Sequence, residues 1–117
     1  MLITLHYKEN MQDKISIGRL NDYYGGILNP HQQEIMRLYF DCDMSLAEVS
    51  VEMGITRQAV REILIRSTNK LTDLEEKLKL VEKIKSVTTC VEGIINKTEE
   101  ETTKTELIAL LKIIKEI

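Results

Sequence analysis

The sequence predicts an all-α fold organised around a helix-turn-helix. Glu, Lys, Leu and Ile dominate the 117 residues and only 4% are aromatic, which is the composition of a helical protein. β-Branched residues nowhere alternate cleanly with polar ones, as a half-buried strand would require. The length suits one domain with a small core. We therefore expect a single helical domain over 1–117, with a helix-turn-helix core at 13–85 and a C-terminal helical extension at 86–117.

The first helix is expected at about Asp13–Tyr24. Its apolar residues follow the helical period and are Ile17, Leu20, Tyr23 and Tyr24. Gly25 and Gly26 end it, because glycine adopts the left-handed conformation of a helix C-cap at little cost. The preceding residues, 1–10, fit either a short strand or a first helical turn.

A second helix is expected to begin at Asn29 and Pro30. Asn accepts hydrogen bonds from first-turn N–H groups, and Pro at the first helical position lacks only an N–H that would be unpaired. The inward stripe, which ends at the break over residues 41–43, consists of Ile35, Leu38 and Tyr39. His31 lies in the first turn, so we expect a solvated side chain there rather than a catalytic or metal-binding one.

The strongest motif follows this break. Ser45 and Glu48 form a capping box at the start of a short helix, expected at about Leu46 to Met53. Gly54 ends that helix because it takes positive φ cheaply, and Thr56 can N-cap the next one. Two helices joined by a short glycine-containing turn make a helix-turn-helix. An ordinary helical hairpin is the alternative that this pattern leaves open.

The helix after Thr56 is expected to run unbroken from Arg57 to about Ser86. Its apolar residues alternate by threes and fours and are Val60, Leu64, Ser67, Leu71, Leu74, Leu78 and Val81. The pattern loosens over 86–89, and a further short helix is expected to end near Asn96. A polar linker over 97–104 and a last helix at Thr105–Ile117 complete the chain.

Apolar residues in the C-terminal half exceed what so few short helices can cover. They are Leu74, Leu78, Val81, Leu110 and Ile114. We therefore expect a homodimer, formed through the long helix or the last helix.

The second helix of the motif presents a polar face. At about 100° per residue, its buried side carries Val60, Ile63 and Leu71. The opposite side and its flanks carry Arg57, Gln58, Arg61, Glu62, Ile65, Arg66 and Asn69. In a DNA-reading helix-turn-helix the first turns of this helix enter the major groove, where Gln suits adenine and Arg suits guanine or phosphate. The expected nucleic-acid-binding residues are therefore Thr56, Arg57, Gln58, Arg61 and Arg66.

Charge limits the strength of that binding. Glu62 would face phosphates and Ile65 offers only apolar contact. Residues 45–70 contain four basic and three acidic residues, a net charge of +1, and the whole chain carries −3. A tight electrostatic grip on nucleic acid is not expected, so binding should be modest or depend on dimerisation.

The positions of the cysteines and of the apolar residues argue against a metalloprotein, a disulfide-bonded protein and a membrane-spanning protein. Cys42 and Cys90 have neither C-x-x-C spacing nor a neighbouring His, so we expect no zinc site, no disulfide and no other cofactor or metal. No apolar run approaches the roughly 20 residues of a membrane span. Residues 1–5 lack the charged start of a signal peptide, and we expect a cytoplasmic protein.

The stretch LNPHQQEIMRLYFDCDMSLAEVSVEMGITRQAV resembles the DNA-binding region of bacterial sigma factors. It is more closely similar to the YlxM-like family, small bacterial helix-turn-helix proteins described as regulatory or associated with the signal recognition particle. The shared motifs lie at Leu20–Tyr24, Asp41–Glu48 and Thr56–Val60. The resemblance implies a sigma-like helical fold. Arg61 stands where the family usually has Tyr, and no family motif matches after Ser86.

Three functions fit these features to different degrees. The leading one is a regulatory protein that binds nucleic acid, either DNA or signal recognition particle RNA. It would act as an accessory factor of the signal recognition particle pathway. The alternative is an adaptor without direct nucleic-acid binding, whose acidic surface meets the particle's protein or its receptor. An enzyme is the weakest, because no nucleophile, carboxylate pair in a cleft, glycine-rich phosphate loop or metal spacing is visible.

Overall fold

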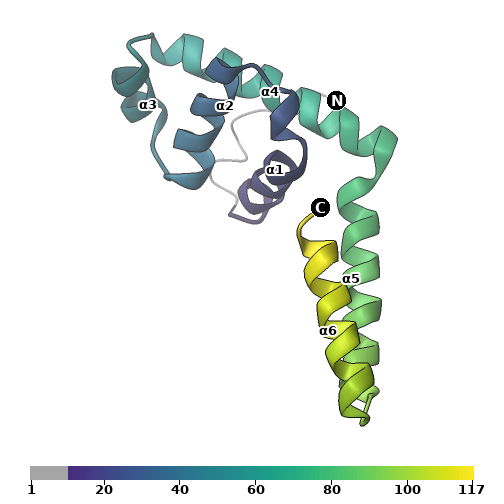
Figure 1. Cartoon of the computed structure of the whole chain (residues 1–117). Coiled ribbons are helices and arrows are strands. Elements are labelled where there is room, and N and C mark those ends of the chain that lie inside the picture. The colour runs from purple at the N-terminus through teal and green to yellow at the C-terminus, as the bar shows by residue number, and fades with distance from the viewer. Residues whose placement is uncertain (1–10) are drawn as a thin grey trace. The chain divides into compact units, whose positions relative to one another are not determined.

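The computed structural model describes the backbone of residues 11–117 and the side chains from residue 14 onward. This part contains six α-helices, two short helical segments and no strand, which confirms the all-α prediction (Figure 1). The elements are α1 (Met11–Tyr24), η2 (Gly25–Ile27), α2 (Pro30–Met36), η3 (Arg37–Asp41), α3 (Leu46–Met53), α4 (Arg57–Leu78), α5 (Leu80–Lys97) and α6 (Glu101–Lys115). The expectations for residues 1–10 lie outside the described residues. None of the helices in the described part is long and apolar enough to cross a membrane.

Contacts divide the chain into two compact units, Met1–Leu78 and Lys79–Ile117. The predicted boundary between 85 and 86 therefore falls inside α5 and not at the contact boundary. A single domain over 1–117 stays a prediction.

The first unit is built on α4. Helices α1, α2 and α3 each pack against it, and Figure 1 shows them gathered along one side of its length. The buried apolar side chains of this unit are Ile17, Tyr24, Leu28, Ile35, Met36, Leu38, Tyr39, Val49, Val60, Leu64 and Leu71. α4 contributes one stripe at helical spacing, so the predicted seam is confirmed from Val60 to Leu71.

The unbroken helix predicted over Arg57–Ser86 is wrong beyond Leu78. α4 ends at Leu78, because Lys79 adopts the left-handed conformation, with φ 56° and ψ 28°. Neither glycine nor proline marks this position. The residues of the predicted long helix instead belong to two packing units, since α4 packs on α1–α3 and α5 packs on α6.

Two further boundaries differ from prediction. α5 runs unbroken through residues 86–89, because Ile84 and Val91 lie on the same side of one helix and are both buried. The predicted linker shrinks to residues 98–100, and α6 begins at Glu101 instead of Thr105.

η3 is a widened turn of π-helix that continues α2. The Cys42 N–H donates to the carbonyl of Arg37, five residues earlier, at 3.1 Å. The Met44 N–H then donates to the carbonyl of Leu38 at 3.1 Å, while Asp43 between them has φ 54°. Single π turns are frequent at functional sites, and this one leads directly into the cap of α3.

The second unit is an antiparallel hairpin of α5 and α6, which lie side by side in Figure 1. Its buried apolar side chains are Ile84 and Val91 of α5 and Ile114 of α6. Neither cysteine of the chain forms a disulfide, and Cys90 on α5 is an exposed thiol.

The packing of α3 can be tested with two valines on the same helix. Val49 is fully buried, whereas Val51 is 83% exposed. Val49→Ala should lower the free energy of unfolding by about 1–3 kcal/mol, because it removes two buried methyl groups and leaves a cavity. Val51→Ala should change it by less than about 0.5 kcal/mol. Urea denaturation followed by circular dichroism measures both, and equal costs would contradict this packing.

Candidate nucleic-acid interface

A reciprocal cap starts the first helix of the motif. The Glu48 N–H donates to Ser45 Oγ at 3.1 Å, and the Ser45 N–H donates to Glu48 Oε1 at 3.0 Å. These two bonds satisfy N–H groups that would otherwise be unpaired at a helix start. The predicted capping box is confirmed, and with it the start of α3 at Leu46.

The turn between the helices depends on Gly54, which has φ 68° and ψ 31°. In this conformation the Ile55 N–H reaches the carbonyl of Ser50 at 3.1 Å. Thr56 Oγ1 then accepts a hydrogen bond from the Ala59 N–H at 3.0 Å and caps α4. The predicted glycine turn and Thr56 cap are therefore both confirmed, and the hydroxyl of Thr56 serves the helix start.

Burial fixes the rotation of α4 about its axis. Val60 and Leu64 are fully buried, so the side opposite them faces outward. The exposed side chains on its first turns are Arg57, Gln58, Arg61, Glu62 and Arg66. Four of the five predicted binding residues are therefore exposed, beside Thr56 at the helix start, although Arg57 and Arg66 are nine positions apart and lie on the two opposite flanks of α4. Ile65, predicted to face outward, is half-buried.

Three guanidinium groups on this surface are available. Among the described residues, none forms a hydrogen bond or ion pair with the guanidinium group of Arg57, Arg61 or Arg66. Arg37 differs, since its Nε donates to Glu34 Oε1 at 2.6 Å, which raises the pKa of Arg37. An unpaired arginine can donate two parallel hydrogen bonds to a phosphate or to a guanine edge.

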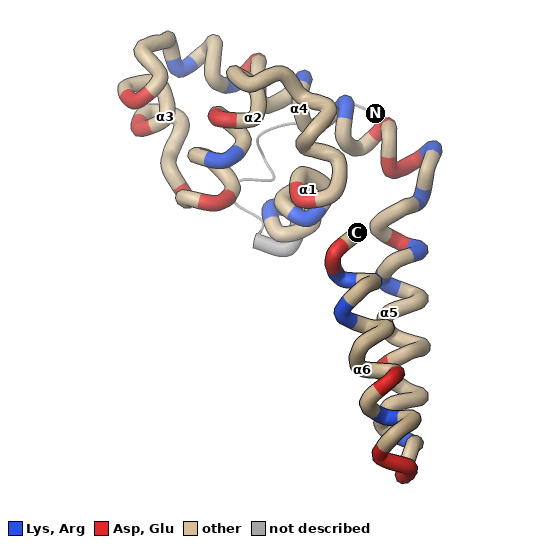
Figure 2. The backbone as a smooth tube through the Cα atoms, viewed as in Figure 1, with Lys and Arg blue, Asp and Glu red and all other residues tan. Residues whose placement is uncertain are grey.

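Glu62 interrupts the surface. Gln58 Nε2 donates to Glu62 Oε1 at 3.4 Å, a long hydrogen bond between residues one turn apart. Figure 2 shows charges of both signs along α4, whereas the charged residues on α3 are acidic. The surface is therefore polar and arginine-bearing without being strongly basic.

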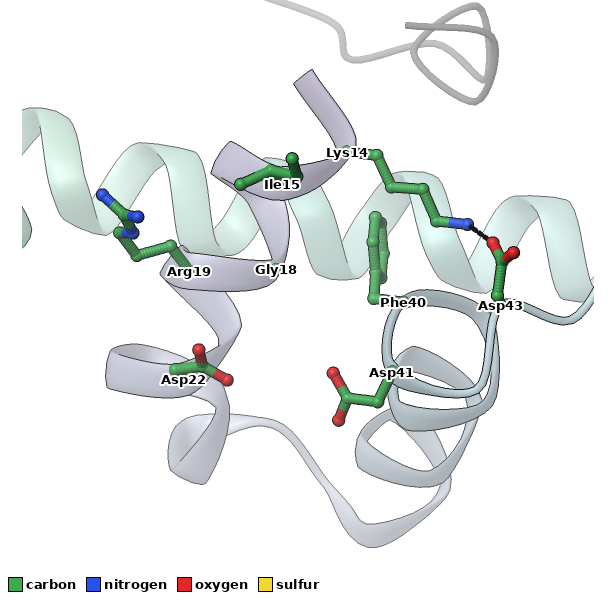
Figure 3. Close-up of a pocket in the computed structure, with 8 residues that line it drawn as sticks. All are labelled: Lys14, Ile15, Gly18, Arg19, Asp22, Phe40, Asp41 and Asp43. Atoms are coloured by element: carbon green, nitrogen blue, oxygen red, sulfur yellow. Dashed lines mark hydrogen bonds and ion pairs between the residues drawn. The ribbon is translucent and has the colours of Figure 1, made fainter. Parts of the chain in front are cut away.

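A second feature was not predicted from the sequence. A hollow of about 420 Å³ lies between α1 and η3 (Figure 3). It is lined by Lys14, Ile15, Gly18, Arg19, Asp22, Phe40, Asp41 and Asp43. The only sequence signal was the pair of aspartates at the 41–43 break, because α1 and η3 are brought together by tertiary packing alone.

The hollow holds two carboxylates near one another. Figure 3 shows Asp22 and Asp41 projecting toward each other across it. Burial, and then the negative charge of Asp41, raise the pKa of Asp22 above 3.8, while Arg19 opposes this shift. Two carboxylates disfavour the binding of phosphate in this hollow. The hollow therefore does not extend the arginine surface, by which we mean the exposed side chains of Arg57, Arg61 and Arg66. In the part of the chain described, no group of three His, Cys, Asp or Glu side chains is placed to hold a metal ion.

The edge of the hollow is held by Lys14. Its ammonium pairs with Asp43 and lies 5.1 Å from the centre of the Tyr39 ring. Burial, with a smaller effect from Asp43, raises the pKa of Tyr39 to about 12. The Tyr39 phenol is therefore neutral at physiological pH and acts as part of the core.

Comparison with known proteins points to one family. A family described as "UPF0122: Putative helix-turn-helix protein, YlxM / p13 like" matches residues 11–111. A UPF0122 protein of Desulforamulus reducens is 41% identical over 86 residues, which cover 74% of each chain. A UPF0122 protein of Clostridium novyi is 41% identical over 87 residues, covering 74% of this chain and 76% of the relative. No solved structure matches the chain significantly.

The turn geometry predicts opposite effects for two glycine substitutions. Gly54→Ala should lower the free energy of unfolding by about 1–2 kcal/mol, because alanine is strained at positive φ. Gly18→Ala in α1, where no atom lies within 4 Å of an added Cβ, should raise it by up to about 1 kcal/mol. Urea titration of both variants is the measurement, and a neutral Gly54→Ala would contradict the left-handed turn.

The hollow predicts a pH-dependent effect of Asp22→Asn. Because folding raises the pKa of Asp22, the folded state binds more protons than the unfolded state just above pH 3.8, and stability falls as pH rises through that window. Asp22→Asn should therefore stabilise the protein at about pH 7 and lose this advantage at about pH 3. Urea denaturation at both values tests it; a variant less stable than the original at neutral pH would refute the assignment.

Proposed function

Since the chain belongs to the UPF0122 family of YlxM/p13-like helix-turn-helix proteins, we propose that it is a regulatory protein that binds nucleic acid through the start of α4. One observation carries the proposal. Arg57, Arg61 and Arg66 are exposed on α4, and their guanidinium groups form no hydrogen bond or ion pair with the other described residues. They occupy the part of the motif that enters the major groove in DNA-reading relatives of this fold class.

The proposed binding is modest and sensitive to salt. Residues 45–70 carry a net charge of only +1, and Glu62 lies within the surface. Few phosphate contacts give a small electrostatic contribution, which falls linearly with the logarithm of salt concentration. A homodimer belongs to the proposal, because helix-turn-helix readers commonly gain affinity by binding two half-sites.

DNA and signal recognition particle RNA are the two candidate ligands. The shape of the major groove differs between the two kinds of duplex. An α-helix fits the major groove of B-form DNA, whereas the major groove of an RNA helix is too deep and narrow for side chains to read. Gln58 should therefore contribute to sequence preference on DNA and little on duplex RNA. Signal recognition particle RNA is the RNA to test, since the resemblance to the YlxM-like family motivates an accessory role in that pathway. The proposed role is one of binding without catalysis.

Removal of two arginines tests the surface. Arg57→Ala with Arg61→Ala should weaken binding to DNA or to signal recognition particle RNA by about tenfold for each arginine. It should also reduce the salt slope by about one unit for each lost phosphate contact. Fluorescence anisotropy titrations at low and moderate salt measure both quantities.

The matched control is Lys112→Ala with Lys115→Ala on α6. It removes the same charge from exposed positions outside the motif and should leave the affinity within about twofold. If neither nucleic acid binds at low salt, or if both double variants lose affinity equally, the arginine surface is not the binding site.

A second function is favoured by the outer side of α3. Val51 is 83% exposed and lies between Glu48 and Glu52 in the sequence of that helix. An exposed valine flanked by acids suits a basic, partly apolar protein segment, such as one on the signal recognition particle protein or its receptor.

This adaptor function makes a distinct prediction for calorimetric titration with those purified proteins. Val51→Lys should abolish binding, while the double arginine variant should retain it. The opposite outcome, with binding lost only when Arg57 and Arg61 are removed, favours the nucleic-acid surface.

A further inference from the structure

The hairpin of α5 and α6 exposes more large apolar side chains than it buries. Three are buried, namely Ile84, Val91 and Ile114. Those left exposed are Val87, Ile94, Ile108, Leu110, Ile113 and Ile117. The predicted dimer residue Ile114 is therefore inside the hairpin, whereas Leu110 remains available.

Five of the exposed side chains share one side of the hairpin. At about 100° per residue, Val87 and Ile94 lie about 60–80° from the buried line of α5. Leu110, Ile113 and Ile117 lie about 40–100° from Ile114 on α6, in the same rotational sense. For antiparallel helices, equal senses place both sets on the same side of the pair. We call these five residues the hairpin face. Ile108 falls on the other side of α6.

The hairpin is too small to be stable through its own core. Residues Lys79–Ile117 form a compact unit of 39 residues that buries only three apolar side chains. Units of this size usually require a disulfide, a metal or an oligomeric contact. Cys90 is a free thiol, and the described residues offer no metal-binding group. Of these three means, an oligomeric contact over the hairpin face is the one left.

We propose that a second copy of the chain covers the hairpin face, so that two hairpins form a four-helix arrangement. This inference rests on the homodimer of the proposed function and assigns its interface. The charged residues bordering the face are Lys83 on α5 and Glu106 on α6, which are both exposed and opposite in sign. Two identical faces related by a two-fold axis therefore meet without net repulsion, which an isologous contact requires. Helical hairpins pair in this way in four-helix bundles.

Multi-angle light scattering of the full chain at micromolar concentration, without nucleic acid, tests the interface. The unsubstituted chain should show twice the chain mass of 13.5 kDa. Ile113→Glu on the hairpin face should raise the dissociation constant of the dimer by more than about tenfold. Ile108→Glu is the matched control, because Ile108 is 53% exposed against 62% for Ile113 and lies on the other side of the same helix. It should leave the mass unchanged.

A second variant separates loss of folding from loss of contact. Leu110→Ala with Ile113→Ala keeps strong helix formers on α6, so helicity by circular dichroism should be retained while the dimer weakens. A monomer mass for the unsubstituted chain overturns both the dimer and its interface. A dimer that survives Ile113→Glu and the double alanine variant overturns only the interface. Anisotropy titration of the monomeric variant with nucleic acid reports on the arginine surface independently.

Discussion

Burial of one stripe of α4 is the constraint on which the first unit depends. Val60, Leu64 and Leu71 have no exposed surface, and α1, α2 and α3 all pack against the helix that carries them. Tyr24 of α1 adds a hydrogen bond from its hydroxyl to Glu75 Oε1 at 2.6 Å. Because a helix is rigid, fixing one side fixes the other. The exposure of Arg61 and Arg66, away from this stripe, is thus a consequence of core packing.

The arginine surface has guanidinium groups that can bind a ligand, but its low net charge attracts nucleic acid only weakly. Its guanidinium groups have no internal partners among the described residues, yet Glu62 lies between them and α3 presents only acidic charges. Such a surface suits discrimination more than a tight grip, because repulsion from misplaced phosphates penalises incorrect docking. Two copies held together would compensate for the small number of contacts made by one.

The π turn η3 contributes an acidic side chain to the hollow beside α1. Asp41, its last residue, faces Asp22 across the hollow, and burial raises the pKa of Asp22. The ion pair of Lys14 with Asp43 compensates part of this negative charge at the edge. Ser67 on α4 is a second polar group in an unfavourable environment. Its side chain is fully buried, and its hydroxyl has no hydrogen-bond partner within the described residues. Polar groups left in this way cost stability.

The sequence by itself determined the features that act over a few residues. Three of these features depend only on neighbours within four positions, namely the Ser45 cap, the left-handed Gly54 and the Thr56 cap. The helical spacing of apolar residues in α4 likewise predicts which side of the helix is buried from Val60 to Leu71. Tertiary structure decided the rest. The hollow at Asp22 arises from packing between α1 and η3, which lie apart in the sequence, and neither glycine nor proline marks the break at Lys79. Local preference alone cannot specify which of several competing packings buries the most apolar surface.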